Sequence, residues 1–138
     1  MKLEVQVVNL ELSKKLKKLG VKQESLFDWY CQVGGIVCDT DVRGKWTIRP
    51  TSERNQGFGE RCSAFTVAEL GEILPGRIRL PDDDYWLWTT KGKDEDFWEC
   101  RYYNAKREMP FNQIQEETEA DARAKMLIHL IEIGVINP

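Results

Sequence analysis

Apolar residues recur with a helical period near the start of the chain. Leu12, Leu16 and Leu19 lie four and three residues apart, so they share one side of a helix, and Gly20 follows as a stop signal. The polar positions of the same segment carry Lys14, Lys15, Lys17 and Lys18. The pattern predicts an amphipathic helix over residues 10–19 with a lysine-rich outer side.

Two further helices are predicted from their first residues and their apolar stripes. Thr66 and Glu69 have the spacing of a capping box, and a Pro-Gly pair at 75–76 ends the helix that they begin. Thr118 is a favourable N-cap for a third helix, which Gly134 closes. The apolar side of this third helix consists of Ala120, Ala124, Leu127, Ile128 and Ile131.

Between the helices the pattern changes to alternation with a period of two, which predicts strands. The expected strands cover residues 26–32, 36–38, 46–48, 85–90 and 97–103. The last two form a hairpin around the polar turn at 91–96. Trp86 and Trp88 share one face of its first arm, while Trp98, Cys100 and Tyr102 share one face of its second arm. If these faces coincide, an aromatic layer forms the core.

The order of these elements predicts an α+β fold over residues 1–138, taken as a single domain. We expect an antiparallel sheet of about four to five strands, packed against two to three α-helices. The polar stretch at 50–62 has no clear period and is expected to be a long irregular loop.

Composition limits the function classes. Of the 138 residues, 41% are hydrophobic and 31% are charged, as in ordinary globular proteins, and the net charge is −3. This balance lacks the basic excess of a typical nucleic-acid-binding protein. The first residues lack a signal-peptide pattern, and no apolar run reaches the ~20 residues needed to span a membrane. The expected location is the cytoplasm, without membrane association.

Four cysteines occur at wide and uneven spacing: Cys31, Cys38, Cys62 and Cys100. A zinc site normally contains a pair two to four residues apart, and the closest pair here has six intervening residues. We therefore expect reduced, buried thiols, and neither a metal nor a cofactor.

No catalytic set is recognisable. His129, the one histidine, has Asp121, Lys125 and Glu132 at helical spacing, which indicates a solvated helix face. The acidic runs at 82–84 and 94–96 fall at opposite ends of one predicted hairpin arm, as solvated turns would. The Gly57-Phe58-Gly59 segment lacks the lysine of a phosphate-binding loop. The sequence therefore predicts a protein that is not an enzyme, with a small carboxylate-dependent hydrolase as the remaining catalytic alternative.

The expected contact surfaces are the loop at 50–62 and the outer face of the predicted hairpin, and the candidate binding residues lie in the loop. Arg54, Phe58 and Arg61 combine an apolar ring with arginines, which are common interface anchors. A second hypothesis is nucleic-acid binding by the lysine-rich first helix. An uncovered strand edge would also permit a homodimer.

Three segments carry a resemblance that covers most of the chain. They are the lysine-rich segment at 11–23 with Trp29-Tyr30, the segment at 62–75 (CSAFTVAELGEILP) and the segment at 118–130 (TEADARAKMLIHL). Together they resemble small proteins of unassigned function carried by phages, prophages and other mobile elements of bacteria. The resemblance implies an accessory role in the cytoplasm of a bacterial host, where the partner would be a host or phage protein. It implies no reaction, and an aromatic residue commonly occupies the position of His129 in this pattern.

Overall fold

The computed structural model describes residues 1–33, 44–54, 59–93, 96–108 and 110–138. In these ranges the chain forms three α-helices and seven β-strands, and all paired strands are antiparallel. The helices are α1 (Leu10–Lys18), α2 (Val67–Ile73) and α3 (Glu119–Glu132). The strands are β1 (Phe27–Gln32), β2 (Trp46–Pro50), β3 (Gly59–Ser63), β4 (Arg77–Leu80), β5 (Asp83–Lys91), β6 (Trp98–Tyr103) and β7 (Pro110–Glu116). The strand predicted at 36–38 lies outside the described residues.

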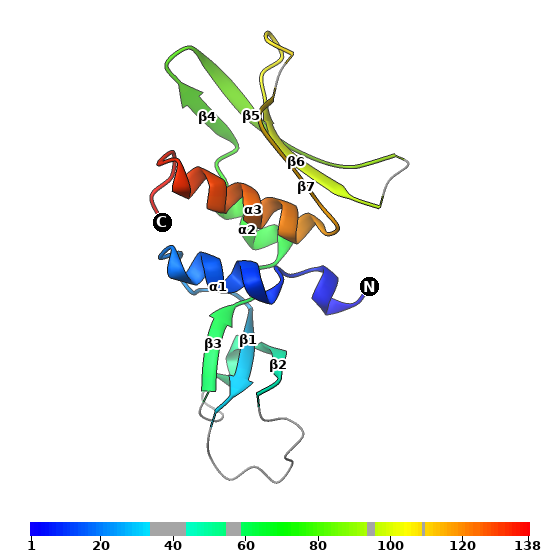
Figure 1. Cartoon of the computed structure of the whole chain (residues 1–138), viewed down its shortest axis with the longest axis vertical. Helices are drawn as coiled ribbons and strands as arrows, with labels where there is room; N and C mark the ends of the chain where they lie inside the picture. The colour runs from blue at the N-terminus through cyan, green and yellow to red at the C-terminus, as the bar shows by residue number, and fades with distance from the viewer. Residues whose placement is uncertain (34–43, 55–58, 94–95, 109) are drawn as a thin grey trace.

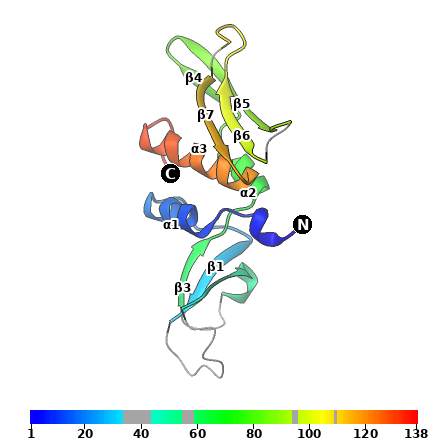
Figure 2. The same cartoon turned by 45° about the vertical axis from the view of Figure 1, so that its right-hand side comes forward.

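The helices lie between two sheets, as Figure 1 and Figure 2 show from two directions. One sheet has the strand order β2-β1-β3, and the other has the order β4-β5-β6-β7. The α+β class, with antiparallel strands packed against helices, is confirmed. The strands are divided between two sheets, whereas the sequence pattern predicts one sheet of four to five strands. The division arises because α2 follows β3 in the chain and separates the first three strands from the last four.

Helix α3 is the centre of the core. It contacts α1 and α2 on one side and strands β6 and β7 on the other. Its buried residues are Ala120, Asp121, Ala122, Ala124, Met126, Leu127, Ile128 and Leu130. The small alanine side chains allow its neighbours to approach closely. Burial thus extends well beyond the single apolar side that the sequence pattern predicts.

The α-helices begin and end at residues that cap them. Asn9 caps α1 by accepting a hydrogen bond from the Leu12 amide, and Gly20 ends this helix with a positive φ of 88°. Thr66 and Glu69 form the predicted capping box of α2. Thr118 caps α3, also as predicted. Local side-chain chemistry therefore explains where all three described helices begin.

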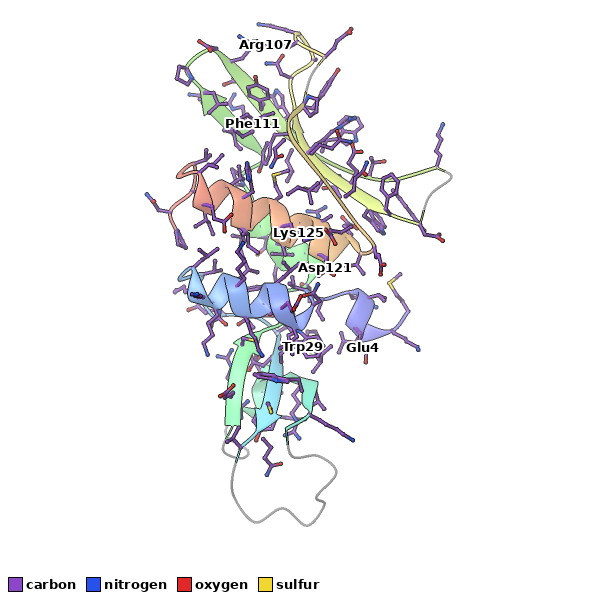
Figure 3. All side chains as sticks on the ribbon, in the orientation of Figure 1. Glu4, Trp29, Arg107, Phe111, Asp121 and Lys125 are labelled. Atoms are coloured by element: carbon purple, nitrogen blue, oxygen red, sulfur yellow. The ribbon has the colours of Figure 1, made fainter. Side chains whose placement is uncertain are left out.

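Hydrogen bonds around Val8 and Asn9 join the two halves of the structure. The Trp29 indole on β1 donates to the Val8 carbonyl over 2.8 Å, and the Val8 amide donates to the Phe65 carbonyl over 2.9 Å. The Asn9 amide donates to the Asp121 carboxylate over 2.8 Å. In Figure 3, Trp29 and Asp121 accordingly lie on either side of the start of α1. Helix α1 is thereby tied to the three-stranded sheet and to α3.

The expected irregular loop at 50–62 is largely regular, so this expectation is wrong for its described residues. Pro50 ends β2, a short 3₁₀ helix covers Thr51–Glu53, and β3 begins at Gly59. Strand β3 is polar because it lies at a sheet edge, and its polarity concealed the strand pattern. Gly59 is required there, since a Cβ atom at this position would come within 2.3 Å of the Cys31 carbonyl oxygen.

The predicted hairpin is present as β5 and β6, but the expected aromatic core layer is not. Trp86 pairs with Tyr103, and Trp88 pairs with Arg101. Residues that pair across strands share a face, so both tryptophans lie opposite the face that contains Cys100 and Tyr102. Cys100 and Tyr102 are fully buried against the helices, whereas Trp86 is 56% exposed and Trp88 is 53% exposed. The sequence alone does not show which face of β5 is buried, because both faces carry large side chains.

Candidate functional site

Arg54 and Arg61, two of the three predicted partner-binding residues, converge on one buried carboxylate. Asp28 on β1 is only 1% exposed. The Arg54 guanidinium donates to both of its oxygens, over 2.7 and 2.8 Å, and Arg61 lies 3.9 Å away. This bidentate hydrogen bond raises the pKa of Arg54. Phe58, the third predicted residue, lies outside the described residues.

Further contacts hold the two arginines against the three-stranded sheet. Arg54 donates to the Gln23 carbonyl over 3.1 Å, and Arg61 donates to the Arg54 carbonyl over 2.7 Å. The guanidinium carbon of Arg61 also lies 4.6 Å from the centre of the Tyr30 ring, and that of Arg49 lies 4.4 Å from it. The structure thus brings Arg54 and Arg61 together beside Asp28. Their donors are used mainly to stabilise the three-stranded sheet, so partner contact by Arg54 and Arg61 stays a prediction.

A different surface stands out on the four-stranded sheet. We use the term outer face for the side of this sheet that points away from α3. The strand register assigns to it Arg77, Arg79, Asp84, Trp86, Trp88, Thr90, Glu99, Arg101, Tyr103, Gln113 and Gln115. Helix α3 covers the opposite face. The two exposed tryptophans lie on β5, a central strand, so they occupy the middle of the outer face.

Arginines are stacked beside the aromatic rings of the outer face. The guanidinium carbon of Arg77 lies 5.3 Å from the centre of the Trp86 ring, and that of Arg101 lies 5.3 Å from the centre of the Tyr103 ring. Arg77 also pairs with Asp84 at 3.5 Å. These contacts restrain the side chains before any partner binds, which lowers the entropy cost of binding.

Sequence reasoning named the outer face of the hairpin as a contact surface, but it assigned Trp86 and Trp88 to a core layer and did not identify Arg77 and Arg79 as part of the surface. A signal was present in the alternation of residues 77–80, which places Arg77 and Arg79 on one face and Ile78 and Leu80 on the other. The same alternation in β5 separates Tyr85 and Leu87 from the tryptophans. The pairing register is needed to show that the arginine side and the tryptophan side coincide.

The catalytic candidates do not form a site in the described part of the chain. His129 is half-buried on α3, and the Asp121 predicted beside it on a solvated face is buried instead. Among the run at 82–84, Asp83 pairs with Arg107 at 3.5 Å. Hydrogen bonding by Asn104 is the main cause that lowers the pKa of Asp83, and a hydrogen bond from the Asp84 amide and the charges of Lys106 and Arg107 lower it further. A general acid at neutral pH needs a raised pKa, so Asp83 is unsuited to that role.

The cysteines are placed separately in the core. Cys31, Cys62 and Cys100 are free and buried, and Cys38 lies outside the described residues. The described residues include no group of three or more His, Cys, Asp or Glu side chains arranged to hold a metal ion. The helices of the described ranges are also too short or too polar to cross a membrane.

Comparison with known proteins adds no family to this description. We found no family model, curated protein or solved structure that matches the chain.

The Asp28 cluster predicts a large effect of Arg54→Ala on stability. Among the described residues, this change leaves Arg61, at 3.9 Å, as the remaining cation paired with a buried carboxylate, so we expect the free energy of unfolding to fall by about 3 kcal/mol. Arg49→Ala is the matched control: Arg49 lies opposite Asp28 on the neighbouring strand, but its described contact is with the Tyr30 ring, which is worth about 1 kcal/mol. Urea unfolding followed by circular dichroism measures both. Equal stability of the two variants would contradict a structural role for Arg54.

Burial of Cys100 predicts low thiol reactivity and a stability limit at alkaline pH. Burial raises the pKa of Cys100 from 9.0 to about 11. The folded state therefore keeps the thiol protonated where the unfolded state ionises, and this contribution to stability is lost as the pH rises from about 9 to 11. At pH 8, iodoacetamide should modify Cys100 in the unfolded protein but not in the folded protein, as read by mass spectrometry. Equal modification rates in the two states would show that Cys100 is accessible.

Proposed function

We propose that this protein is a non-enzymatic binding module that recognises another protein through the outer face. The single observation that supports this proposal is the exposure of Trp86 and Trp88 in the middle of a sheet face. Exposed tryptophans gathered on one surface are unusual in the absence of a partner. Burying the exposed half of each ring would contribute roughly 2–3 kcal/mol.

The composition of the outer face favours a protein partner. Its eleven positions include three arginines, two tryptophans and one tyrosine, and none of these described positions carries a lysine. Tryptophan, tyrosine and arginine are enriched at protein interfaces, whereas lysine is depleted there. From a strand spacing of about 4.8 Å and a rise of about 3.4 Å per residue, the whole face covers roughly 400 Å², with the two exposed tryptophans at its centre.

The charges indicate the chemistry of the partner. Arg77, Arg79 and Arg101 outnumber the two carboxylates of the outer face, Asp84 and Glu99. A complementary surface would present carboxylates around an apolar centre that receives the tryptophans. The resemblance to small phage and prophage proteins supports an accessory role of this kind in a bacterial cytoplasm.

The test is a tagged pull-down from bacterial lysate with nuclease-treated and untreated halves. The protein is compared with a Trp86→Ser/Trp88→Ser variant, whose stability should change little because both side chains are half exposed. We expect a protein partner that survives nuclease and whose binding weakens at least 30-fold in the variant, as for interface residues worth about 2 kcal/mol each.

A Leu26→Ser/Ile133→Ser variant is the matched control, since it removes two exposed apolar side chains far from the outer face. It should retain the partner. Equal retention by both double variants would refute the outer face as the contact surface. The partner can also be a second copy of this chain, and sedimentation velocity of the purified protein tests this case. A dimer that dissociates in the Trp86→Ser/Trp88→Ser variant would identify the partner as a second copy.

A further inference from the structure

A groove lies between α1 and the edge strand β3, on the other side of the helices from the outer face. Its volume is about 890 Å³. Three lysines of α1 line one wall, namely Lys14, Lys17 and Lys18, while Trp46 from β2 and Glu60 from β3 contribute to the other. We call this feature the lysine groove.

The lysines of this groove lack the carboxylate partners that other lysines nearby have. Within the described residues, none of the three forms an ion pair, whereas Lys15 pairs with Glu132 at 2.7 Å and Lys22 pairs with Glu24 at 2.9 Å. Glu60 is the one carboxylate among the described residues that line the groove. The groove therefore has a local positive excess in a chain whose net charge is −3. Such an excess attracts an anionic ligand.

Trp46 indicates which anionic ligand fits. Its ring is half-buried in the groove wall, and the Lys14 ammonium lies 4.4 Å from the ring centre. If Lys14 moves from the ring to a phosphate, the indole can stack against a base. Lys14 and Lys18 are one helical turn apart, about 6 Å along the axis, so they can meet neighbouring phosphates. Lys17 is partly held in place, since it donates to the Arg61 carbonyl over 2.6 Å.

We propose that the lysine groove binds single-stranded nucleic acid, with the lysines on the phosphates and Trp46 against a base. An unpaired strand is required because a base in a duplex does not offer its face to a side chain. The lysine groove differs from the outer face in two respects. It is rich in lysine, and its described residues include no pair of exposed tryptophans. The proposal is independent of the protein-binding function proposed above.

The test is fluorescence anisotropy with a labelled 12-nucleotide oligo(dT) and a labelled 12-base-pair duplex. Three phosphate contacts predict that the logarithm of the affinity falls with the logarithm of salt concentration with a slope of about −2. Binding of oligo(dT) should thus weaken about 20-fold between 50 and 200 mM NaCl. The duplex should bind more weakly than oligo(dT) at each salt concentration.

Two double variants distinguish the effect of the groove lysines on binding from the effect of the overall charge of the protein. Lys14→Gln/Lys18→Gln should reduce the salt slope to about −0.7. Lys15→Gln/Lys22→Gln removes the same charge from lysines that are already paired, and should leave the affinity within twofold. Trp46→Leu should weaken oligo(dT) binding at least about fivefold without changing the slope.

Three results would overturn the proposal: no binding at 50 mM NaCl, equal losses in the two lysine variants, or duplex binding as tight as oligo(dT) binding. Circular dichroism checks that Trp46→Leu is folded. If it is not, the lysine variants and the comparison of single strand with duplex still decide the outcome, because Lys14 and Lys18 are exposed.

Discussion

The burial of α3 between the other two α-helices and the four-stranded sheet is the constraint on which the rest of the structure depends. Eight of its residues are buried, and it contacts α1, α2, β6 and β7. A helix in this position covers one face of the four-stranded sheet and leaves none of the described helices for the other face (Figure 2). The exposure of Trp86 and Trp88 is therefore a consequence of the layer order and not of a local irregularity.

The same layer order separates two surfaces of different chemistry. The outer face combines arginine with tryptophan and tyrosine, and the lysine groove combines lysine with one half-buried tryptophan. Between them lie α2 and α3, which are fixed by apolar packing and by hydrogen bonds such as that from Asn9 to Asp121. Under the two proposals made above, this arrangement keeps the two ligands from contacting each other.

Local chemistry made the helices predictable. The Thr66–Glu69 capping box, the Thr118 cap and the leucine stripe of α1 each involve residues close in sequence. The failures concern contacts between distant residues. Strand β3 pairs with β1, more than 25 residues earlier, and the pairing of Trp86 with Tyr103 determines which side of β5 faces solvent. For the candidate site, the sequence shows only that Arg54 and Arg61 belong to the same polar segment of the chain. Their attachment to Asp28 depends on the fold and could not be predicted.

The central claim is that the outer face is free in the isolated protein and covered in the complex. Hydroxyl-radical footprinting read by mass spectrometry tests this directly, because it reports the accessibility of individual tryptophans in both states. The account predicts that Trp86 and Trp88 are readily oxidised in the isolated monomer and protected in the captured complex, while Leu26 stays accessible in both. Unchanged oxidation of Trp86 and Trp88 in the complex, or protection of both in the monomer, would contradict it.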